Sequence, residues 1–303
     1  MKISEKGKGY AFALVATLAM ANVYVFSKAA LVELNLFQFG FFWFGFAILW
    51  NVIYAIPAGK VKVARQLKVK QIKLLLLLGV IEVIGTSLLF ISIETSDNPA
   101  IMSFLQNMTP LFVILMGVTI LSERFTAWQV AGIVITLGGA VITSFSGSIK
   151  GSGFFVPGTA YMIASTFFTA IGLIISRMYI KKLDPGLLSL NRTLYLFTLA
   201  AILMIVNKES FVISNKALFN VVVGSLVGPF LTAISNYSSI KYIEASKSSI
   251  VQSSRGLFVT VGAWIYFSSI PHAYQLLGGI ITIIGVIILI SAKDVIKLKK
   301  EGL

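Results

Sequence analysis

A long apolar hairpin occurs twice in this chain, and the repeat limits the possible folds more than any other feature. The first copy runs from Asp97 to Phe145, with a charged turn at residues 122–124 between two apolar runs. The pattern returns 146 residues later: Gln106, Gln129, Gly132 and Gly139 recur as Gln252, Gln275, Gly278 and Gly285, and Leu111-Phe112-Val113 recurs as Leu257-Phe258-Val259. Matches in register without a gap indicate an internal repeat, so we predict two copies of one module.

The apolar runs are of membrane-spanning length. Of the 303 residues, 57% are hydrophobic and 12% are charged, whereas charged residues make up about a quarter of a soluble domain. Runs of about 20 apolar residues are long enough to cross the hydrocarbon core of a bilayer as helices. The composition therefore predicts an all-α integral membrane protein.

Ten such runs can be placed along the sequence, and we expect each to be a transmembrane helix. They are roughly residues 10–32, 37–56, 72–93, 99–121, 128–145, 155–180, 187–206, 218–240, 246–270 and 274–292. A glycine- and serine-rich linker, residues 146–153, falls halfway along. The sequence thus predicts two five-helix repeats, residues 1–147 and 154–303, on either side of this linker.

The distribution of basic residues predicts how the repeats are inserted. Five helices is an odd number, so the second repeat must enter the membrane from the opposite side. With the N-terminus in the cytoplasm, nineteen of the 25 lysines and arginines fall in cytoplasmic segments, and the outer segments hold only Lys150, Lys208 and Lys216. Because basic residues favour cytoplasmic loops, we predict an inverted repeat in the cytoplasmic membrane, with both termini cytoplasmic.

Inverted repeats favour a transport function, because two copies related by an axis in the membrane plane allow inward-open and outward-open shapes of similar energy. The substrate site is then expected near the midplane, between the first, third and fourth spans and their partners, the sixth, eighth and ninth. Glu82 in the third span and Arg255 in the ninth should lie at similar depth. We expect them to form an ion pair or share a water-filled cavity, where they bind substrate or only lock the helices together.

Polar residues also follow one face of the two repeated spans. Gln106 and Asn107 on the fourth span correspond to Gln252 and Ser253 on the ninth. Positions three, four and seven apart share a helix face, so these stripes could line a pseudo-twofold site or hydrogen-bond neighbouring helices. The complete set of candidate cavity residues is Asn22, Glu82, Gln106, Asn107, Gln252, Ser253 and Arg255.

Other charged residues and the repeated glycines are expected to have structural roles. Lys28 and Arg192 lie near span ends, where their side chains can reach the headgroups. The repeated glycines of the fifth and tenth spans predict close helix packing. Gly228 and Pro229 predict a kink in the eighth span.

Other functional classes find little support. The chain has no cysteine and one histidine, His272, in an outer loop, so we expect no metal site, no cofactor and no enzymatic activity. The positive charge is explained by cytoplasmic loops rather than by a nucleic-acid partner. A channel is the stronger rival, although nothing resembles a filter loop or a ring of charges.

The hairpin also carries a family resemblance. The segment Leu121-Ser-Glu-Arg-Phe-Thr-Ala-Trp-Gln-Val-Ala-Gly132, with Gly138-Gly139 and Pro110, resembles the EamA-type branch of the drug/metabolite transporter superfamily. The Lys182-Leu-Asp-Pro185 turn also fits, although in the second repeat Ser269 replaces the glutamate and Gly256 the proline. The resemblance implies ten helices in two bundles and export or exchange of a small metabolite. The resemblance does not fix the substrate. A zwitterionic amino acid is the leading expectation because it could satisfy both Glu82 and Arg255, with exchange of sugars or phosphorylated metabolites as the alternative; coupling to a proton or a counter-substrate is left open.

Overall fold

A computed structural model gives the fold and describes residues 5–56, 69–121, 126–147, 154–179, 184–243, 248 and 251–300. Within these ranges the chain is helical and has no strand, apart from an isolated bridge between Phe145 and Phe155. The principal helices are α1 (Glu5–Leu31), α2 (Leu36–Ala55), α4 (Val69–Thr95), α5 (Pro99–Leu105), η1 (Gln106–Met108), α6 (Thr109–Leu121), α7 (Ala127–Ser144), α8 (Thr159–Tyr179), α9 (Pro185–Val206), α10 (Asn215–Ser225), η2 (Leu226–Thr232), α11 (Ala233–Tyr242), α13 (Arg255–Phe267) and α14 (Ala273–Lys300). The charged turn at 122–125 and linker residues 148–153 lie outside the described residues.

Among the described residues, seven helices are long and apolar enough to cross a membrane: α1, α2, α4, α7, α8, α9 and the continuous stretch from α10 to α11. The other three predicted spans are helical but interrupted or shorter. The fourth is divided into α5, η1 and α6, the ninth contains the 13-residue α13, and α14 contributes the apolar stretch Ala273–Ile288. The chain is therefore a multi-pass helical protein, and ten membrane-spanning helices stay a prediction.

One of the two repeated glutamine pairs, Gln129 and Gln275, lies at the starts of two equivalent helices. The Gln129 side chain accepts a hydrogen bond from the backbone N–H of Thr126 (3.0 Å) in a capping box at the start of α7. The Gln275 side chain accepts one from the backbone N–H of His272 (3.0 Å) at the start of α14. Both satisfy a backbone donor that the first helical turn leaves free. The recurrence of glutamine 146 residues apart therefore has a structural cause.

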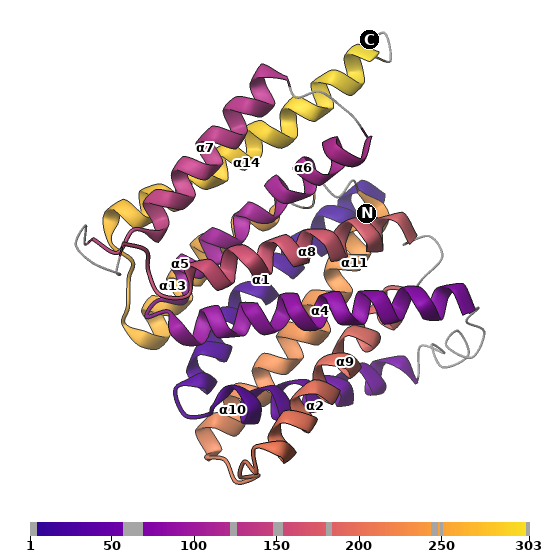
Figure 1. Cartoon of the computed structure of the whole chain (residues 1–303), viewed down its shortest axis with the longest axis vertical. Coiled ribbons are helices and arrows are strands. Elements are labelled where there is room, and N and C mark those ends of the chain that lie inside the picture. Colours follow the sequence, from indigo (N-terminus) through magenta and orange to yellow (C-terminus); the bar gives the residue numbers. More distant parts are fainter. Residues whose placement is uncertain are drawn as a thin grey trace.

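Helices α7 and α14 lie side by side at one end of the bundle (Figure 1). Glycines allow this approach: a Cβ atom added to Gly139 would lie 2.5 Å from the backbone nitrogen of Thr282, and one added to Gly285 would lie 2.5 Å from that of Thr136. The two contacts are equivalent through the repeat. The predicted role of the repeated glycines in close packing is confirmed at these positions.

A second pair of glycine contacts relates the two repeats. A Cβ added to Gly9, near the start of α1, would meet Ile243 just beyond α11, and one added to Gly158, before α8, would meet the carbonyl of Ser92 near the end of α4. In Figure 1, α1 and α8 begin at opposite edges of the bundle. Equivalent contacts thus lie at opposite edges, as an inverted arrangement requires.

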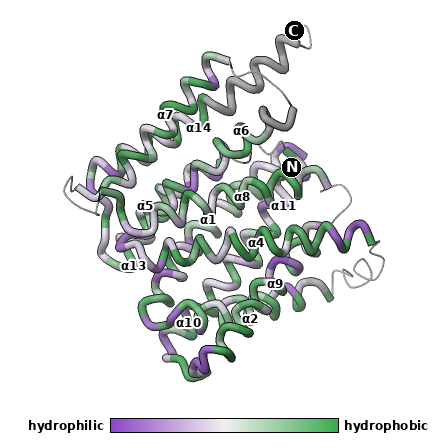
Figure 2. The backbone as a smooth tube through the Cα atoms, viewed as in Figure 1, coloured by the Kyte–Doolittle hydropathy of each residue, from purple (hydrophilic) through white to green (hydrophobic). Residues whose placement is uncertain are grey.

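The hydrophobic surface and the core fit a protein surrounded by lipid. Apolar residues run along the middle of most helices, and the more polar segments gather toward their ends (Figure 2). Many large apolar side chains face outward, including Leu77, Val80 and Val134. Inside, Tyr24 and Trp43 are fully buried in an aromatic and aliphatic core.

Candidate functional site

A cavity with polar and charged walls lies between the two repeats. It holds about 960 Å³ of unfilled space, part of which is open to the surface. Its lining comes from α1, α4, α8, α9, η1, α6, η2, α11, the segment before α13 and the first residue of α13. The lining includes Met20, Glu82, Thr86, Leu89, Gln106, Ser165, Thr169, Leu173, Arg192, Asn236, Tyr237, Ile240, Ser248, Gln252 and Arg255. Both repeats therefore contribute walls to one site.

The cavity runs toward the edge that carries the N-terminus. Ile240 lies in the last turn of α11, and Leu173 lies within two turns of the end of α8; both helices end at that edge. At the other end the lining stops at Met20 and Leu89, behind which the buried core packs. The lining residues nearest to a helix end therefore lie toward the N-terminal edge.

Glu82 is paired with a residue that the sequence did not select. Its carboxylate lies 2.8 Å from Nε of Arg192 on α9, and Arg192 also donates to Thr86 Oγ1 (3.0 Å). Of the two arrangements expected for Glu82 and Arg255, an ion pair or a shared cavity, the structure has the shared cavity. The expectation that Arg192 reaches the headgroups is wrong. An arginine seven residues beyond the helix start at Pro185 can turn inward, and a nearby carboxylate makes that position favourable.

Arg255 is held by neutral groups. This side chain is 9% exposed, and its Nε donates to the carbonyl of Gln252 (2.9 Å) while its Nη1 donates to Oε1 of Gln106 (2.6 Å). The same amide oxygen accepts a hydrogen bond from the hydroxyl of Tyr24 (2.8 Å). A carbonyl and an amide orient the guanidinium without neutralising it.

Gln252 also lies in the cavity wall, where its amide nitrogen donates to Oδ1 of Asn236 (3.0 Å) and to the hydroxyl of Ser248 (2.9 Å). Gln106 and Gln252, predicted as equivalents, thus both face the cavity. Gln106 carries a further role as the partner of Arg255. Tyr24 and Asn236 carried no signal in the sequence, since each is one of many polar side chains within spans.

Asn107 and Ser253 do not line the cavity. Both are at most 1% exposed, and the Asn107 side chain donates to the carbonyl of Ser253 (3.0 Å). These two residues are repeat equivalents, so the fourth and ninth spans touch at their matching positions. The expectation of cavity lining is corrected for both: they join the repeats.

Asn22 lies apart from the cavity as well. It is exposed, and its side chain donates to the carbonyl of Leu18 one turn earlier on α1 (2.9 Å). Lys28 is half-buried rather than extended toward headgroups, because its Nζ donates to the carbonyls of Glu94 (2.9 Å) and Ser96 at the end of α4. Each of these side chains satisfies backbone groups, which is a structural role.

Irregular helix segments adjoin the cavity. Residues 106–108 form a single 3₁₀ turn between α5 and α6, and the regular helix is broken again at Ser254, just before α13. The irregularity predicted at Gly228 and Pro229 takes the form of a π-helical segment, η2. Broken helices expose backbone groups, and in transporters they are commonly found at the substrate site. The carbonyl of Gln252, which binds Arg255, is one such group.

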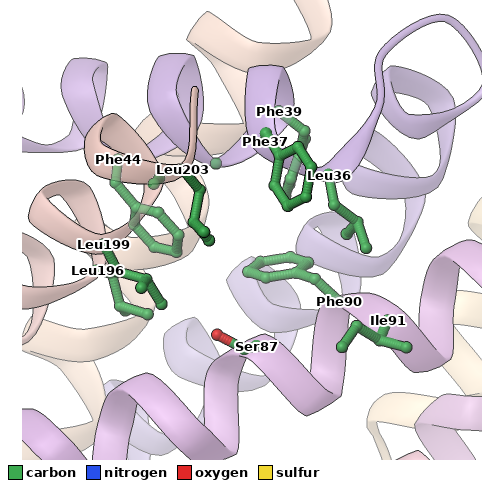
Figure 3. A pocket seen from close by; sticks show the side chains of 12 residues that line it. Leu36, Phe37, Phe39, Phe44, Ser87, Phe90, Ile91, Leu196, Leu199 and Leu203 are labelled. Carbon is green, nitrogen blue, oxygen red and sulfur yellow. The ribbon is translucent and has the colours of Figure 1, made fainter. Parts of the chain in front are cut away.

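A second recess is almost entirely apolar. It lies between α2, α4 and α9 and holds about 580 Å³ of unfilled space. Figure 3 shows phenylalanines and leucines around it, among them Phe39, Phe90 and Leu199, with Ser87 as the one polar side chain labelled. Its walls could contact only an apolar group, so it does not compete with the charged cavity as a site for a polar solute.

Comparison with known proteins agrees with this architecture. Residues 7–145 and 156–291 each match the EamA-like transporter family. No curated protein matches the chain. A solved structure titled only "Crystal structure of protein" is similar, with a TM-score of 0.65 and 16% identity, over 93% of this chain and 98% of the other. At that identity the similarity shows the fold alone.

Proposed function

Because the chain belongs to the EamA-like transporter family, we propose that it is a secondary transporter that exports an amino acid or a related small metabolite by alternating access. Membership makes it a multi-pass membrane transporter. The proposal adds ten spans, inverted insertion in the cytoplasmic membrane and cytoplasmic termini, which rest on the distribution of basic residues. The edge toward which the cavity runs is then the cytoplasmic one, an arrangement that supports an inward-open state in this proposal.

One observation carries the proposal: a single cavity, walled by both repeats, contains a carboxylate and two guanidinium groups. Charged side chains within a membrane are costly unless they face protein or water, and in carriers they mark the substrate or ion pathway. Oppositely charged groups in one cavity suit a solute that carries both an ammonium and a carboxylate group. This favours an amino acid over a sugar, which would leave the charges without partners.

The experiment is uptake by the purified protein in liposomes, with amino acids, sugars and phosphorylated metabolites offered separately. A carrier gives saturable uptake that is stimulated by the same solute inside the vesicle. Flux that rises in proportion to concentration without a limit would instead identify a channel. Absence of uptake for every solute class would contradict the proposed function.

The orientation has its own test. The chain lacks cysteine, so single cysteines placed at Ser4 and Ser148 can be labelled by a reagent that does not cross the membrane. We expect Ser148→Cys to be labelled in intact cells and Ser4→Cys only after the membrane is opened. Labelling of both variants from the same side would contradict the inverted repeat.

A further inference from the structure

The charges in the cavity do not cancel. Glu82 and Arg192 form an ion pair, whereas Arg255 donates its hydrogen bonds to two neutral groups, the carbonyl of Gln252 and the amide oxygen of Gln106. The other acidic side chains that the structure describes lie at helix ends or in connections, outside the cavity wall: Glu5, Glu33, Glu94, Asp97, Asp184 and Glu209. Counting the described side chains, the empty cavity carries one net positive charge.

Arg255 also keeps donors available for a ligand. A guanidinium has five N–H donors, and the hydrogen bonds to Gln252 and Gln106 use two of them. The remaining donors belong to a side chain that is 9% exposed and lines the cavity. A fixed, desolvated guanidinium with free donors suits a carboxylate, which it can bind through two parallel hydrogen bonds.

The structure therefore points to an acidic amino acid as the substrate, a solute with two carboxylates, one ammonium group and a net charge of −1. This inference rests on the proposed function and narrows it. One carboxylate binds Arg255, the ammonium group binds Glu82, and the second carboxylate faces Arg192. Binding then brings the net charge of the cavity to zero.

Other solutes match these charges less well. A neutral zwitterion has one carboxylate for two guanidinium groups and leaves the net positive charge of the cavity in place. A phosphorylated metabolite without an ammonium group offers nothing to Glu82 and places its phosphate near that carboxylate. A neutral sugar leaves Arg255 without a counter-charge. The amino acids aspartate and glutamate supply all three groups.

The test compares amino acids of nearly equal shape that differ by one charge. The purified full-length protein is titrated with L-aspartate and L-asparagine, and with L-glutamate and L-glutamine, in a thermal-shift assay. Uptake of the same four labelled amino acids is then measured in liposomes. We expect each acidic amino acid to bind about tenfold or more tightly than its amide, because one charge-assisted contact is lost in the amide.

Two variants separate the role of Arg255 from a general effect of charge. Arg255→Gln should remove the preference, so that the acid and the amide bind within about twofold of each other. Lys216→Gln removes the same charge at an exposed position beside Glu33, outside the cavity, and should keep the preference. The folded state of each variant is checked by its elution volume and its melting temperature without ligand.

The outcomes are distinct. Equal or tighter binding of asparagine and glutamine by the wild-type protein would overturn the inference and leave an amino-acid carrier in place. Tighter binding of inorganic phosphate or a sugar phosphate than of aspartate would also overturn it, and would assign a different anion to Arg255. Absence of uptake for all solutes would overturn the inference together with the function on which it rests. Loss of the preference in Lys216→Gln would show that it does not arise in the cavity.

Discussion

The contact between α7 and α14 allows a test with a matched control one residue away. Gly139 is buried against the backbone of Thr282, whereas a Cβ added to its neighbour Gly138 would meet no atom within 4 Å. Replacement of either glycine by alanine gains the same helix propensity, roughly 1 kcal/mol. Because this gain is shared, the difference between the two variants measures only the cost of forcing the helices apart.

That cost can be bounded from the geometry. A Cβ 2.5 Å from a backbone nitrogen cannot be relieved by rotating a side chain, so one helix must shift. Overpacking of this kind costs about 1–3 kcal/mol. We expect Gly139→Ala to be less stable than Gly138→Ala by that amount, and Gly285→Ala to show a similar loss because it meets Thr136 in the equivalent contact.

The measurement is reversible unfolding of the purified variants in mixed micelles with increasing SDS, followed by circular dichroism. Transport activity of each variant in liposomes serves as the control for the native fold. Equal stability of Gly138→Ala and Gly139→Ala would refute the close contact between α7 and α14. A loss in Gly139→Ala without one in Gly285→Ala would refute the equivalence of the two contacts.

Three further predictions concern the cavity. Thr169→Trp should fill the cavity and abolish uptake at normal expression, whereas Val134→Trp on the outer face of α7 should leave uptake unchanged; uptake by Thr169→Trp at the wild-type rate would place the site elsewhere. Glu82→Gln should lower the free energy of unfolding by about 1–2 kcal/mol, less than for a fully buried ion pair because both side chains are more than a fifth exposed. Adding Arg192→Gln should restore part of that free energy, and a double-mutant cycle that shows no coupling would contradict the ion pair. In net uptake the carrier must return empty, with the charge of Arg255 uncompensated, whereas in exchange it returns with substrate bound. Exchange of internal for external substrate should therefore be about tenfold faster than net uptake, and equal rates in the two assays would contradict this.

The sequence is informative about helices and their packing. Apolar length and the repeat predicted the helical segments, the repeated glycines act in packing, and the repeated pair Gln129 and Gln275 acts in capping. These features depend on neighbours along the chain or on the repeat itself. Gly139 and Gly285, for example, occupy equivalent places because the same helix hairpin is built twice.

The sequence was less informative about which charges meet. Counting residues from the start of a span gives depth, and Glu82 and Arg255 do line one cavity. Depth does not give the direction in which a side chain points, however. Helix α4 packs against α9, and at this contact Arg192 of α9 lies beside Glu82 of α4. The position of Arg192 near a span end is compatible with an outward side chain as well as an inward one, so its place in the sequence does not predict the pair with Glu82.

The prediction for the polar residues on the fourth span was wrong in part, also because the direction of a side chain was not known. The expectation that Gln106 and Asn107 share the cavity assumed a regular α-helix. Residues 106–108 instead form a 3₁₀ turn, which has about three residues per turn and changes the faces that follow. Gln106 therefore reaches Arg255, while Asn107 is buried against Ser253. Pro110 is the local cause: it has no N–H for the carbonyl of Gln106, which accepts instead from the backbone N–H of Thr109.

The two repeats have equivalent helix packing, but their charged residues in the cavity are not equivalent. Asn107 meets its own equivalent, Ser253, so packing positions keep the pseudo-twofold relation. The position equivalent to Arg255 is Thr109, which carries no charge. A twofold arrangement of helices allows two access states of similar energy, whereas charged residues that are not repeated in the other copy give the substrate a single orientation. Arg192 and Arg255 belong to the second repeat and Glu82 to the first, so together they would hold a solute across the boundary between the repeats. In the proposed alternating-access mechanism, this is the boundary at which the two repeats move.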